Sequence, residues 1–412
     1  MAEPPDLPLP SVLALADPGD FLRAVTSRPW FHANLDDLNV AEMWALVAMC
    51  ALARKERPDE VRCDVYTRGQ SGAGRFAHAV GFDAARDGET FGASQVARTV
   101  AIQRVALGAS AATVADRIAR LAVPGEAESE SRGALAYVID ELLRNVLQHS
   151  GDPLGAVVAA QRVEAGRGGY ARPTVQVTVA DTGRGIAESL KRHHEIPDAR
   201  VALEKALRPH VSGTFPEGQT GSLNNAGLGL FFTSEMAKLT AGRFLLASRG
   251  AALLLSSDED LGTHHVEFLP PPDTGFPGTL AVFELPLEIE DRDALLQVIR
   301  GRATERTPAL TKRTWLSYEA PPAAVHVFDV RARISDAADA NRLGEEIREL
   351  VAQGKPVALD FAGIEIATQS FLHALLFHAV RVAWAMSASV HVRGASPTVR
   401  SALDYLESYA LK

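Results

Sequence analysis

Three short stretches follow one another through the middle of the chain, and they are Glu141–Asn145, Asp181–Gly185 and Asn225–Leu230. The first lies in a segment with the apolar spacing of an amphipathic helix. The second follows a strand of alternating polarity, and the third opens an apolar helix. The chain therefore needs a fold that contains a helix, a strand end and a helix start in this order.

The first stretch belongs to a predicted helix over residues 133–149. Glu141 and Asn145 are four residues apart, so they share one face of this helix. An apolar stripe occupies another face, formed by Leu135, Ile139, Leu142 and Val146. We therefore expect one side of the helix in the core and the other at a site. The alternative is a solvated face on which Asp140 pairs with Arg144.

The second and third stretches both contain glycines. Asp181 ends an apolar strand, and a buried ionised carboxylate acts only as a hydrogen-bond acceptor. Gly183 and Gly185 follow it, and glycine lets the backbone pass close to a flat ligand. Gly227 and Gly229 open the later helix, where exposed backbone N–H groups attract anions. A plain strand–turn–helix connection capped by Asp181 is the other interpretation of the second stretch.

In their order and spacing, the three stretches resemble the ATP site of the GHKL superfamily, which includes gyrase-type, chaperone and mismatch-repair ATPases, histidine kinases and anti-sigma kinases. The resemblance covers roughly residues 110–290 and implies a Bergerat-type α/β sandwich. We expect the fold class α+β, with this ATPase domain over residues 96–290 between two small α/β domains. The chain has no G-x-x-x-x-G-K-[ST] sequence, which excludes a P-loop NTPase.

The resemblance implies a role for each matching residue, with ATP and Mg²⁺ as the cofactors. Glu141 is the catalytic residue, which orients or activates the attacking water or hydroxyl, and Asn145 is the Mg²⁺ ligand. The residues expected around adenine are Asp181, Gly183, Gly185 and Ile186, together with Thr279, which contacts Asp181 directly or through water. Those expected at the phosphates are Asn225, Gly227, Leu228 and Gly229.

A long, sparsely apolar stretch over residues 187–225 separates the second and third motifs. Such a loop inside a compact domain is usually functional or mobile, and the resemblance implies that it is the ATP lid. Its cations Lys205, Arg208 and His210 either face the phosphates or are solvated. Ser212 has no assigned role.

The N-terminal part divides into two segments. Residues 1–20 are rich in proline, and we expect a mobile tail there. Residues 21–95 alternate predicted strands and helices, and the pattern at Val61–Gly69 is similar to that at Val390–Gly394. We interpret residues 21–95 as a degenerate STAS-like domain that arose from a diverged repeat. The alternative is that any βαβα unit has this pattern.

Beyond a predicted helix and linker over residues 291–322, the pattern is again α/β. Residues 323–412 resemble STAS-like domains, the class that includes anti-sigma-factor antagonists, at Leu359–Gly363 and Gln369–Leu372. In antagonists a serine at this helix start accepts phosphate, and Ser370 occupies a comparable position. The usual Asp-Ser-Ser-Gly is replaced here by Thr-Gln-Ser-Phe. We therefore expect Ser370 to be the helix N-cap rather than a phosphate acceptor.

Composition and charge narrow the partners and the compartment. The net charge of −9 does not suggest a general nucleic-acid-binding surface. Two cysteines, Cys50 and Cys63, form no disulfide framework and indicate a reduced, cytoplasmic setting. We expect no signal peptide, because residues 1–10 lack a cationic start followed by an apolar run, and the longest apolar run, near residues 40–53, is too short to cross a membrane. His193–His194 and His264–His265 lack the i, i+4 spacing of a helical zinc site.

Three functions fit this organisation. The first is an ATP-binding regulatory switch in signalling, with slow Mg²⁺-dependent hydrolysis and a lid whose closure controls interaction with a protein partner. The second is an anti-sigma-type serine/threonine kinase acting on a STAS-like partner, and the third is a non-hydrolysing ATP sensor or scaffold. Glu141 argues against the third, since a mere binder does not need it. Family members often dimerise when ATP closes the lid, so an ATP-dependent homodimer is expected by analogy.

Overall fold

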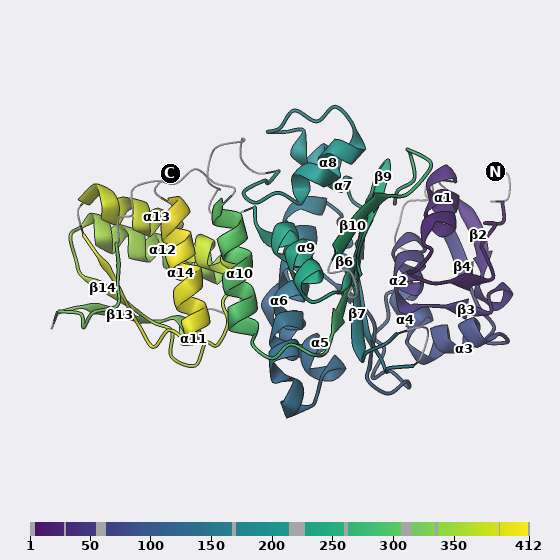
Figure 1. Ribbon diagram of the computed structural model, residues 1–412, viewed down its shortest axis with the longest axis horizontal. Coiled ribbons are helices and arrows are strands. Elements are labelled where there is room, and N and C mark those ends of the chain that lie inside the picture. The colour runs from purple at the N-terminus through teal and green to yellow at the C-terminus, as the bar shows by residue number, and fades with distance from the viewer. Residues whose placement is uncertain are drawn as a thin grey trace.

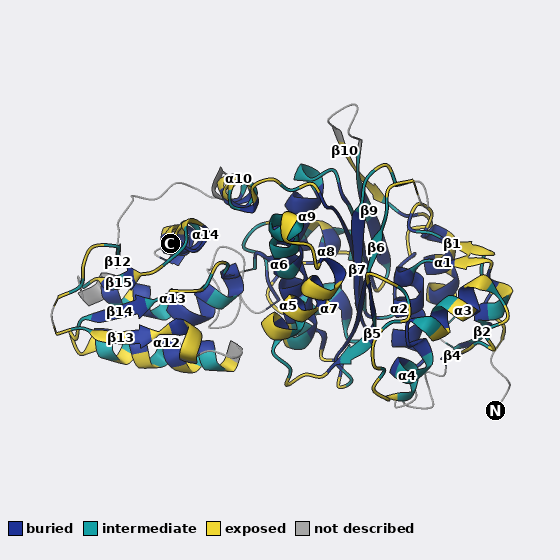
Figure 2. Ribbon diagram, turned by 90° about the horizontal axis from the view of Figure 1, so that it is seen from below, coloured by how far each residue is buried: buried dark blue, intermediate teal, exposed yellow. Residues whose placement is uncertain are grey.

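The computed structural model describes residues 5–28, 30–54, 63–166, 170–213, 227–258, 263–305, 315–322, 324–333, 337–386 and 388–410. Three parts lie side by side along the long axis of the molecule (Figure 1). A central sheet has helices against one face and the N-terminal part against the other, while the C-terminal part lies beyond the helices (Figure 2). One cluster of buried apolar side chains joins the central helices to the C-terminal part, and another joins the N-terminal part to the opposite sheet face.

A seven-stranded antiparallel sheet forms the centre of the described chain. Its strands, in spatial order, are β10 (Thr263–Phe268), β9 (Ala251–Asp258), β8 (Arg243–Ser248), β11 (Thr279–Pro286), β7 (Thr174–Asp181), β6 (Ala156–Val163) and β5 (Thr99–Val105). Every residue of β7 is buried, since both faces of the sheet are covered there. The register of β7 and β11 sets Asp181 opposite Thr279.

The helical face of the sheet is covered by α5 (Ala111–Ala122), α6 (Ser129–Asn145) and α9 (Gly229–Leu239). α6 follows a 3₁₀ turn, η3 (Glu126–Glu128), and continues into a π-helical turn, η4 (Val146–Ser150), so the helix predicted over residues 133–149 spans two elements. Gly151 ends the turn in the left-handed conformation that glycine adopts at little cost. Such π-helical turns occur frequently at functional sites.

Two further helices, α7 (Gly185–Leu190) and α8 (Ala199–Ala206), lie where we expected only a long loop over residues 187–225. The Asp198 side chain caps α8 by accepting a hydrogen bond from the Val201 amide at 2.9 Å. Both helices are short, and nearby prolines obscure their apolar spacing in the sequence. The loop prediction is therefore wrong for these two segments, and residues 214–226 of it lie outside the described chain.

The N-terminal part covers the other sheet face with α2 (Met43–Leu52), in which every residue is buried. Around it are β1 (Val12–Leu13), α1 (Gly19–Ser27), β2 (Phe31–Asn34), η1 (Leu35–Asp37), β3 (Val40–Ala41), β4 (Cys63–Tyr66), α3 (Gly72–Ala79) and α4 (Phe82–Asp87). β1 pairs with β3 and β2 with β4, both in parallel. Residues 5–20 differ from the mobile tail that we expected, because Leu7, Leu13 and Leu15 are buried in this core.

The C-terminal part has a four-stranded parallel sheet in the order β12 (Leu316–Ser317), β15 (Val390–Arg393), β14 (Val357–Asp360) and β13 (His326–Asp329) among the residues that the structure describes. Its helices are α11 (Val330–Arg333), α12 (Ala337–Ala352), α13 (Gln369–Met386) and α14 (Pro397–Ala410). Helix α10 (Arg292–Glu305) packs between α14 and the central helices α6 and α9. The helix that we predicted at the start of residues 291–322 is therefore present and extends to residue 305.

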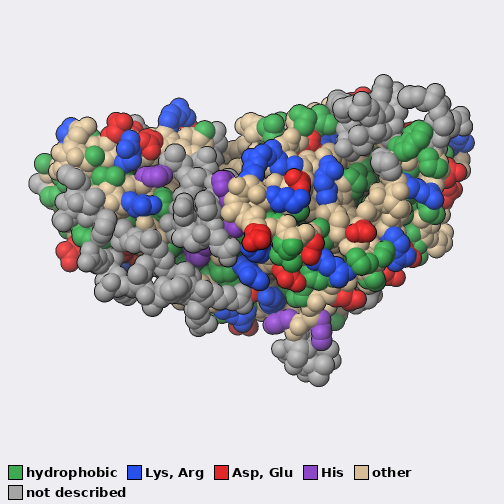
Figure 3. All heavy atoms as spheres, turned by 90° about the horizontal axis from the view of Figure 1, so that it is seen from above, with side chains coloured by type: hydrophobic (Ala, Val, Ile, Leu, Met, Phe, Trp, Pro, Cys, Tyr) green, Lys and Arg blue, Asp and Glu red, His purple; other side chains and the backbone are tan. Residues whose placement is uncertain are grey.

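The surface of the molecule carries charges of both signs. Basic and acidic side chains are interspersed over the described part of the face in Figure 3, and neither sign dominates it. Within the described residues, no helix combines the length and apolar character needed to cross a membrane. Cys50 and Cys63 are both buried and free of a disulfide.

Candidate functional site

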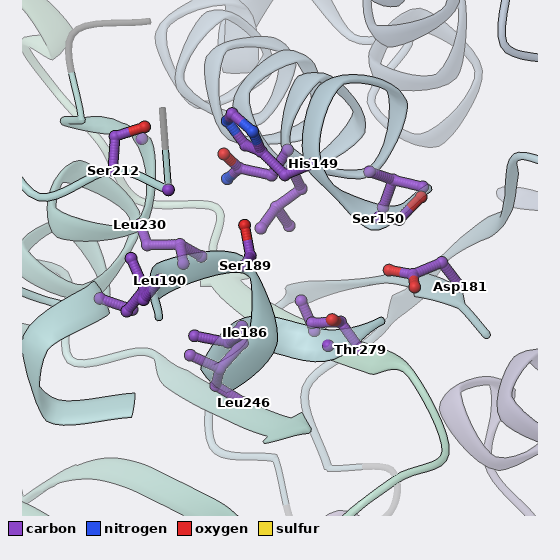
Figure 4. A pocket seen from close by; sticks show the side chains of 18 of the residues that line it. His149, Ser150, Asp181, Ile186, Ser189, Leu190, Ser212, Leu230, Leu246 and Thr279 are labelled. Atoms are coloured by element: carbon purple, nitrogen blue, oxygen red, sulfur yellow. The ribbon is translucent and has the colours of Figure 1, made fainter. Parts of the chain in front are cut away.

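A cavity opens between the sheet and helices α6, α7, α8 and α9 (Figure 4). Its empty volume is about 800 Å³ with the open mouth included. Many apolar side chains line it, and the Asp181 carboxylate points inward from the end of β7. Among the residues that line it are seven predicted from the sequence, namely Asn145, Asp181, Gly185, Ile186, Gly227, Gly229 and Thr279.

The remaining predicted residues have other positions. Gly183 belongs to the loop after Asp181 but does not line the cavity, and Leu228 is fully buried at the start of α9. Glu141 lies one helical turn from Asn145 on α6, behind the cavity wall. Asn225 falls outside the described residues.

α6 brings Glu141 and Asn145 to the first residue of α9. A Cβ atom on Gly229 would lie 2.6 Å from Glu141 Oε2 and 3.4 Å from Asn145 Nδ2, so only glycine fits there without a shift. Glu141 Oε1 and Asn145 Nδ2 are both buried and have no hydrogen-bond partner within the described chain. Unsatisfied buried polar atoms are rare in folded proteins, and Asn145, which lines the cavity, therefore has an amide group available to a ligand there.

The pairing of Asp140 with Arg144 is also present on α6. Arg144 Nε lies 3.0 Å from Asp140 Oδ2, and the side chains are only 6% and 5% exposed. The face that we considered as a solvated alternative is therefore buried, and Glu141 beside it is 1% exposed. The Asp140–Arg144 ion pair expected for a solvated face is thus present, but it is buried, as is the Glu141 carboxylate beside it.

The loop after Asp181 is fixed by close backbone packing. The Gly183 amide donates to Asp181 Oδ1 at 2.8 Å, and a Cβ atom on Gly183 would lie 2.2 Å from the Ser150 carbonyl oxygen. Ser248 Oγ accepts from the Ile186 amide at 2.9 Å and donates to the Gly278 carbonyl at 2.8 Å. The Gly183 amide thus holds the Asp181 carboxylate, while the contacts of Ser150 and Ser248 fix the loop that follows it.

The opposite end of the cavity is formed by the backbone before α9. Gly227 has φ +64°, and a Cβ atom there would lie 2.8 Å from the backbone of Val211. The Val211 amide donates to the Gly227 carbonyl at 3.3 Å, which joins the chain after α8 to the start of α9. This end therefore presents closely packed backbone and a helix N-terminus, which together suit an anionic group.

Two family models match the chain. Residues 130–287 match the histidine kinase-, DNA gyrase B- and HSP90-like ATPase family. The central domain is a GHKL ATPase domain. Residues 339–382 match a STAS-like domain of unknown function, which confirms the predicted fusion and the α+β class. Searches of curated proteins and of solved structures gave no match, and the STAS-like interpretation of residues 21–95 stays a prediction.

Burial dominates the titration of groups in the GHKL ATPase domain. It raises the pKa of Asp181 to about 7, although the Gly183 amide opposes the shift. It also raises the pKa of Glu141 to about 7, and the nearby charge of Asp140 adds to that effect. It lowers the pKa of His149, which lines the cavity, to about 4, so this imidazole is neutral at pH 7. A carboxyl group with a pKa near 7 is suited to general-base chemistry.

Asn145 is the residue whose environment fits a magnesium ion. Asn145 lines the cavity, and its Nδ2 has no protein partner in the described chain. Rotation of the side-chain amide by half a turn places Oδ1, which can ligate a metal, where Nδ2 now lies. Mg²⁺ usually takes one or two protein ligands and completes its shell with phosphate oxygens and water. No cluster of three or more histidine, cysteine or acidic side chains suited to a metal occurs in the described chain. An ion in this site would therefore share its ligands with bound phosphates.

The STAS-like domain contacts the ATPase domain beside this cavity. Ser370 Oγ donates to Glu141 Oε2 at 3.0 Å, and both side chains are buried. Tyr405 Oη lies 2.8 Å from His210 Nε2, and the His210 ring also packs on Tyr409 at 5.1 Å between centroids. His210, one of the cations considered for the phosphates, therefore contacts the STAS-like domain instead.

Ser370 does not cap α13 as we expected. The Phe371 amide donates to Thr368 Oγ1 at 3.2 Å, so Thr368 is the residue that satisfies the helix start. Ser370 is the second residue of α13 and directs its hydroxyl to Glu141 in the other domain. The prediction was wrong because the sequence near a helix start does not reveal which hydroxyl faces the helix and which faces a neighbour.

Several polar residues of the site were not predicted. Ser150 and Ser189 line the cavity, and Ser248 orders the loop around Ile186. Serines at the ends of strands and helices are common, and none of these positions has a spacing that sets it apart in the sequence. Ser212, which had no assigned role, also lines the cavity.

Proposed function

We propose that this protein is an ATP-binding regulatory switch in which the STAS-like domain controls the catalytic residue of the GHKL ATPase domain. One observation carries the proposal. Asn145, Asp181 and Gly227 line a single cavity, and Glu141 beside it is in contact with Ser370 of the STAS-like domain. The proposed nucleotide cavity therefore lies next to the contact through which the STAS-like domain would control Glu141.

Adenine would bind at the end of β7. The ionised Asp181 carboxylate accepts a hydrogen bond from the exocyclic amino group, since an ionised carboxylate is an acceptor only. Ile186 and Leu246 offer apolar surface to the base, while Gly183 and Gly185 keep the loop close to it. The burial of Asp181 strengthens this contact, because no water competes for the carboxylate.

The triphosphate would extend toward α9. The N-terminus of α9 lies at this end, and the helix dipole favours negative charge there. Asn145 would hold Mg²⁺, which supplies charge neutralisation for the phosphates when it is bound. Glu141 and Asn145 both lie close to Gly229, the first residue of α9.

Hydrolysis would use Glu141 as the general base. A water oxygen attacks the γ-phosphorus, its proton moves to the Glu141 carboxylate, and the bond from the γ-phosphorus to the bridging oxygen breaks to leave ADP and phosphate. When the STAS-like domain is docked, as in this structure, the Ser370 hydroxyl donates a hydrogen bond to Glu141 Oε2, and Glu141 is 1% exposed. Turnover is then slow while the STAS-like domain is docked and rises when it is displaced.

Closure over the nucleotide would involve the segment with α7, α8 and Ser212. These elements line one side of the cavity, and Tyr405 links the end of this segment to the STAS-like domain through His210. We propose that a protein partner responds to this closure, in a signalling role, and that ATP favours a homodimer. Cys50 and Cys63 form no disulfide in the described chain, which fits a reduced cytoplasmic setting.

A second candidate is a serine kinase that acts within the chain, and the Ser370–Glu141 distance of 3.0 Å favours it. In that reaction Ser370 Oγ attacks the γ-phosphorus, Glu141 takes the hydroxyl proton, and ADP leaves as the bridging bond breaks. The seryl phosphate would then place a second charge against Glu141 and separate the two domains. The attacking group is the only chemical difference from the switch.

Incubation of the full chain with Mg²⁺ and ATP labelled at the γ-phosphate separates the candidates. The switch predicts free labelled phosphate as the product, with no label on the protein. The kinase predicts label on the protein that the Ser370→Ala variant does not acquire. Absence of both products, with nucleotide bound, would instead favour a non-hydrolysing sensor and would contradict the proposed role of Glu141.

A further inference from the structure

Arg54 follows the C-terminal end of α2 in the N-terminal part and is buried against the ATPase domain. Its guanidinium donates to Asp152 Oδ2 at 2.5 Å and to Thr182 Oγ1 at 2.9 Å. It also donates to the carbonyl oxygens of Leu154 and Gly155 at 3.0 and 3.1 Å. The side chain is 0% exposed, so one arginine of the N-terminal part has partners at four sites of the central domain.

Two of those partners belong to the network around the loop after Asp181. Asp152 Oδ2 accepts from the Thr182 amide at 2.8 Å and from the Thr182 hydroxyl at 2.7 Å. Thr182 is the residue between Asp181 and Gly183, which are the start of the predicted base-binding loop. Arg54 therefore fixes the middle of this loop both directly and through Asp152.

The network also reaches a residue of the cavity wall. The Asp152 amide donates to Ser150 Oγ at 3.0 Å, and Ser150 lines the cavity. The Ser150 carbonyl in turn accepts from the Arg184 amide at 2.8 Å, on the other side of Gly183. Thr182 and Arg184, on the two sides of Gly183, therefore both bond to the turn over residues 150–152, and Arg54 bonds to the same turn.

Helix α2 connects this contact to the rest of the N-terminal part. It packs on β6 and β7, and at its first turn the Trp44 amide donates to Gln176 Oε1 at 3.2 Å. Gln176 precedes Asp181 on β7 by five residues, which is roughly 17 Å along a strand. The two contacts of α2 with the sheet are therefore far apart, so substitutions at Gln176 and at Arg54 test the two ends of one interface separately.

We propose that Arg54 is a positioning residue through which the N-terminal part sets the affinity and selectivity for the adenine base. The inference rests on the proposed ATP-binding function and adds a regulator to its base end. Arg54 has no contact with the cavity, so it acts through Thr182 and Asp152. A ligand or partner that shifts α2 would weaken or tighten nucleotide binding by this route.

The charges in the network support a role beyond packing. Burial opposes the ionisation of Asp152, but the Arg54 charge and the hydrogen bonds from Thr182 outweigh it, and the pKa of Asp152 is lowered. Without Arg54, a buried carboxylate near Asp181 would be left without its cation. The planar guanidinium is also the side chain that can donate to a carboxylate, a hydroxyl and two carbonyls at once.

The test compares variants at the two ends of α2 in the full chain. Arg54→Ala removes the contact to the loop, Arg54→Lys retains the charge with fewer donors, and Gln176→Ala loosens the same interface far from the loop. Calorimetry measures ADP and ATP affinity, competition with GTP measures base selectivity, and circular dichroism confirms folding.

For Arg54→Ala we expect ADP and ATP to bind more weakly by the same factor, about tenfold, which is the order that coupling through a packed network reaches. The preference for ATP over GTP should fall in parallel, since the base-binding loop is displaced, and Arg54→Lys should be intermediate. Gln176→Ala should stay within a few-fold of the wild type.

Three outcomes would overturn parts of this account, and they are distinct. Wild-type protein that binds no nucleotide refutes the proposed function itself. Wild-type binding with unchanged affinity and selectivity in a folded Arg54 variant refutes the inference alone. Equal losses in Arg54→Lys and Gln176→Ala would also refute it, because they would mean general loosening of the interface. If Arg54→Ala does not fold, Arg54→Lys against Gln176→Ala decides the question.

Discussion

The two flanking parts of the molecule approach the same cavity from opposite sides. The N-terminal part covers one face of the sheet and reaches the loop after Asp181 through Arg54, in a network of buried hydrogen bonds and an ion pair. The STAS-like domain lies beyond the helices and reaches Glu141 through the hydroxyl of Ser370. One contact is at the base end of the proposed nucleotide, and the other is at the phosphate end.

The two contacts differ in the free energy that is lost when each is broken. Removing one partner of a buried ion pair leaves an uncompensated charge and typically costs about 3–5 kcal/mol. A hydrogen bond from a neutral hydroxyl to a charged group contributes only about 1.5–3 kcal/mol. We therefore expect the N-terminal part to be a fixed element that sets nucleotide affinity, and the STAS-like domain to be released more readily and to set turnover.

The strongest separation of affinity from turnover is expected for Glu141→Gln. The amide cannot take a proton, and loss of a general base typically lowers the rate by about 10²–10⁴-fold. ATP affinity should stay close to that of the wild type, because Glu141 does not line the cavity. Steady-state phosphate release and calorimetry measure the two quantities.

Glu188→Gln is a suitable control for this variant, since Glu188 is an exposed residue of α7 with a surface partner, Lys191. It should change neither quantity. A Glu141→Gln protein that hydrolyses ATP at the wild-type rate would remove Glu141 from the mechanism.

Ser370→Ala should sharpen the comparison from the side of the STAS-like domain. The variant loses the hydroxyl that occupies Glu141, so docking weakens by about 1.5 kcal/mol or more and phosphate release rises about tenfold. ATP affinity should change little, in contrast to the Arg54 variants. A lower rate of phosphate release in Ser370→Ala would show that the contact promotes turnover rather than restraining it.

How far the sequence predicts this arrangement depends on the distance between the residues involved. The chemistry of Asp181, Gly183 and Gly185 is local, because an acceptor and two glycines within five residues already define a loop that can approach a flat ligand. The start of α9 at Gly229 was also predicted, since Gly227 and Gly229 mark it in the sequence. Residue types and glycines close together in the sequence were thus enough to predict many of the residues that line the cavity.

Long-range contacts were not predictable in the same way. Ser370 and Glu141 are 229 residues apart, and Arg54 and Thr182 are 128 residues apart. Neither pair has a spacing or composition that marks it in the sequence, and each depends on how whole domains pack. The packed leucines near the N-terminus were missed for a related reason, because a proline-rich composition does not show what lies beside it.

The raised pKa of Asp181 predicts a pH dependence at the base end. Its value of about 7 in the folded protein lies above the ordinary 3.8, so below pH 7 ATP binding must release a proton. Affinity should therefore fall about tenfold between pH 8 and pH 6, as measured by calorimetry in two buffers that differ in ionisation enthalpy. Affinity that is independent of pH over this range would contradict the proposed contact of ionised Asp181 with adenine.

The same shift has a consequence for stability. Between about pH 4 and pH 7 the folded protein retains a proton on Asp181 that the unfolded chain has released. The free energy of unfolding without nucleotide should therefore decrease as the pH rises through this range. The contribution is absent in Asp181→Asn, which makes that variant the control for denaturation measurements.

The smallest expected effect belongs to Tyr405→Phe at the edge of the STAS-like interface. The variant loses the hydrogen bond to His210, which is worth about 1 kcal/mol, and it should modestly raise turnover by weakening docking. Tyr318→Phe is the matched control, since Tyr318 bonds Asp404 within the C-terminal part rather than across the interface. Similar effects of the two variants on turnover would argue against His210 and Tyr405 as part of the docking contact.

The most direct measurement is calorimetric titration of the wild type, Asp181→Ala and Asn145→Asp with Mg²⁺ and ATP. The wild type should bind one nucleotide per chain, while Asp181→Ala loses the acceptor for the base and Asn145→Asp sets a carboxylate beside the phosphates, so both should show no measurable binding. The exposed Gln148→Glu, one turn from Asn145 on the outer face, should bind as the wild type does. Full ATP affinity in folded Asp181→Ala would contradict the assignment of this cavity as the nucleotide site.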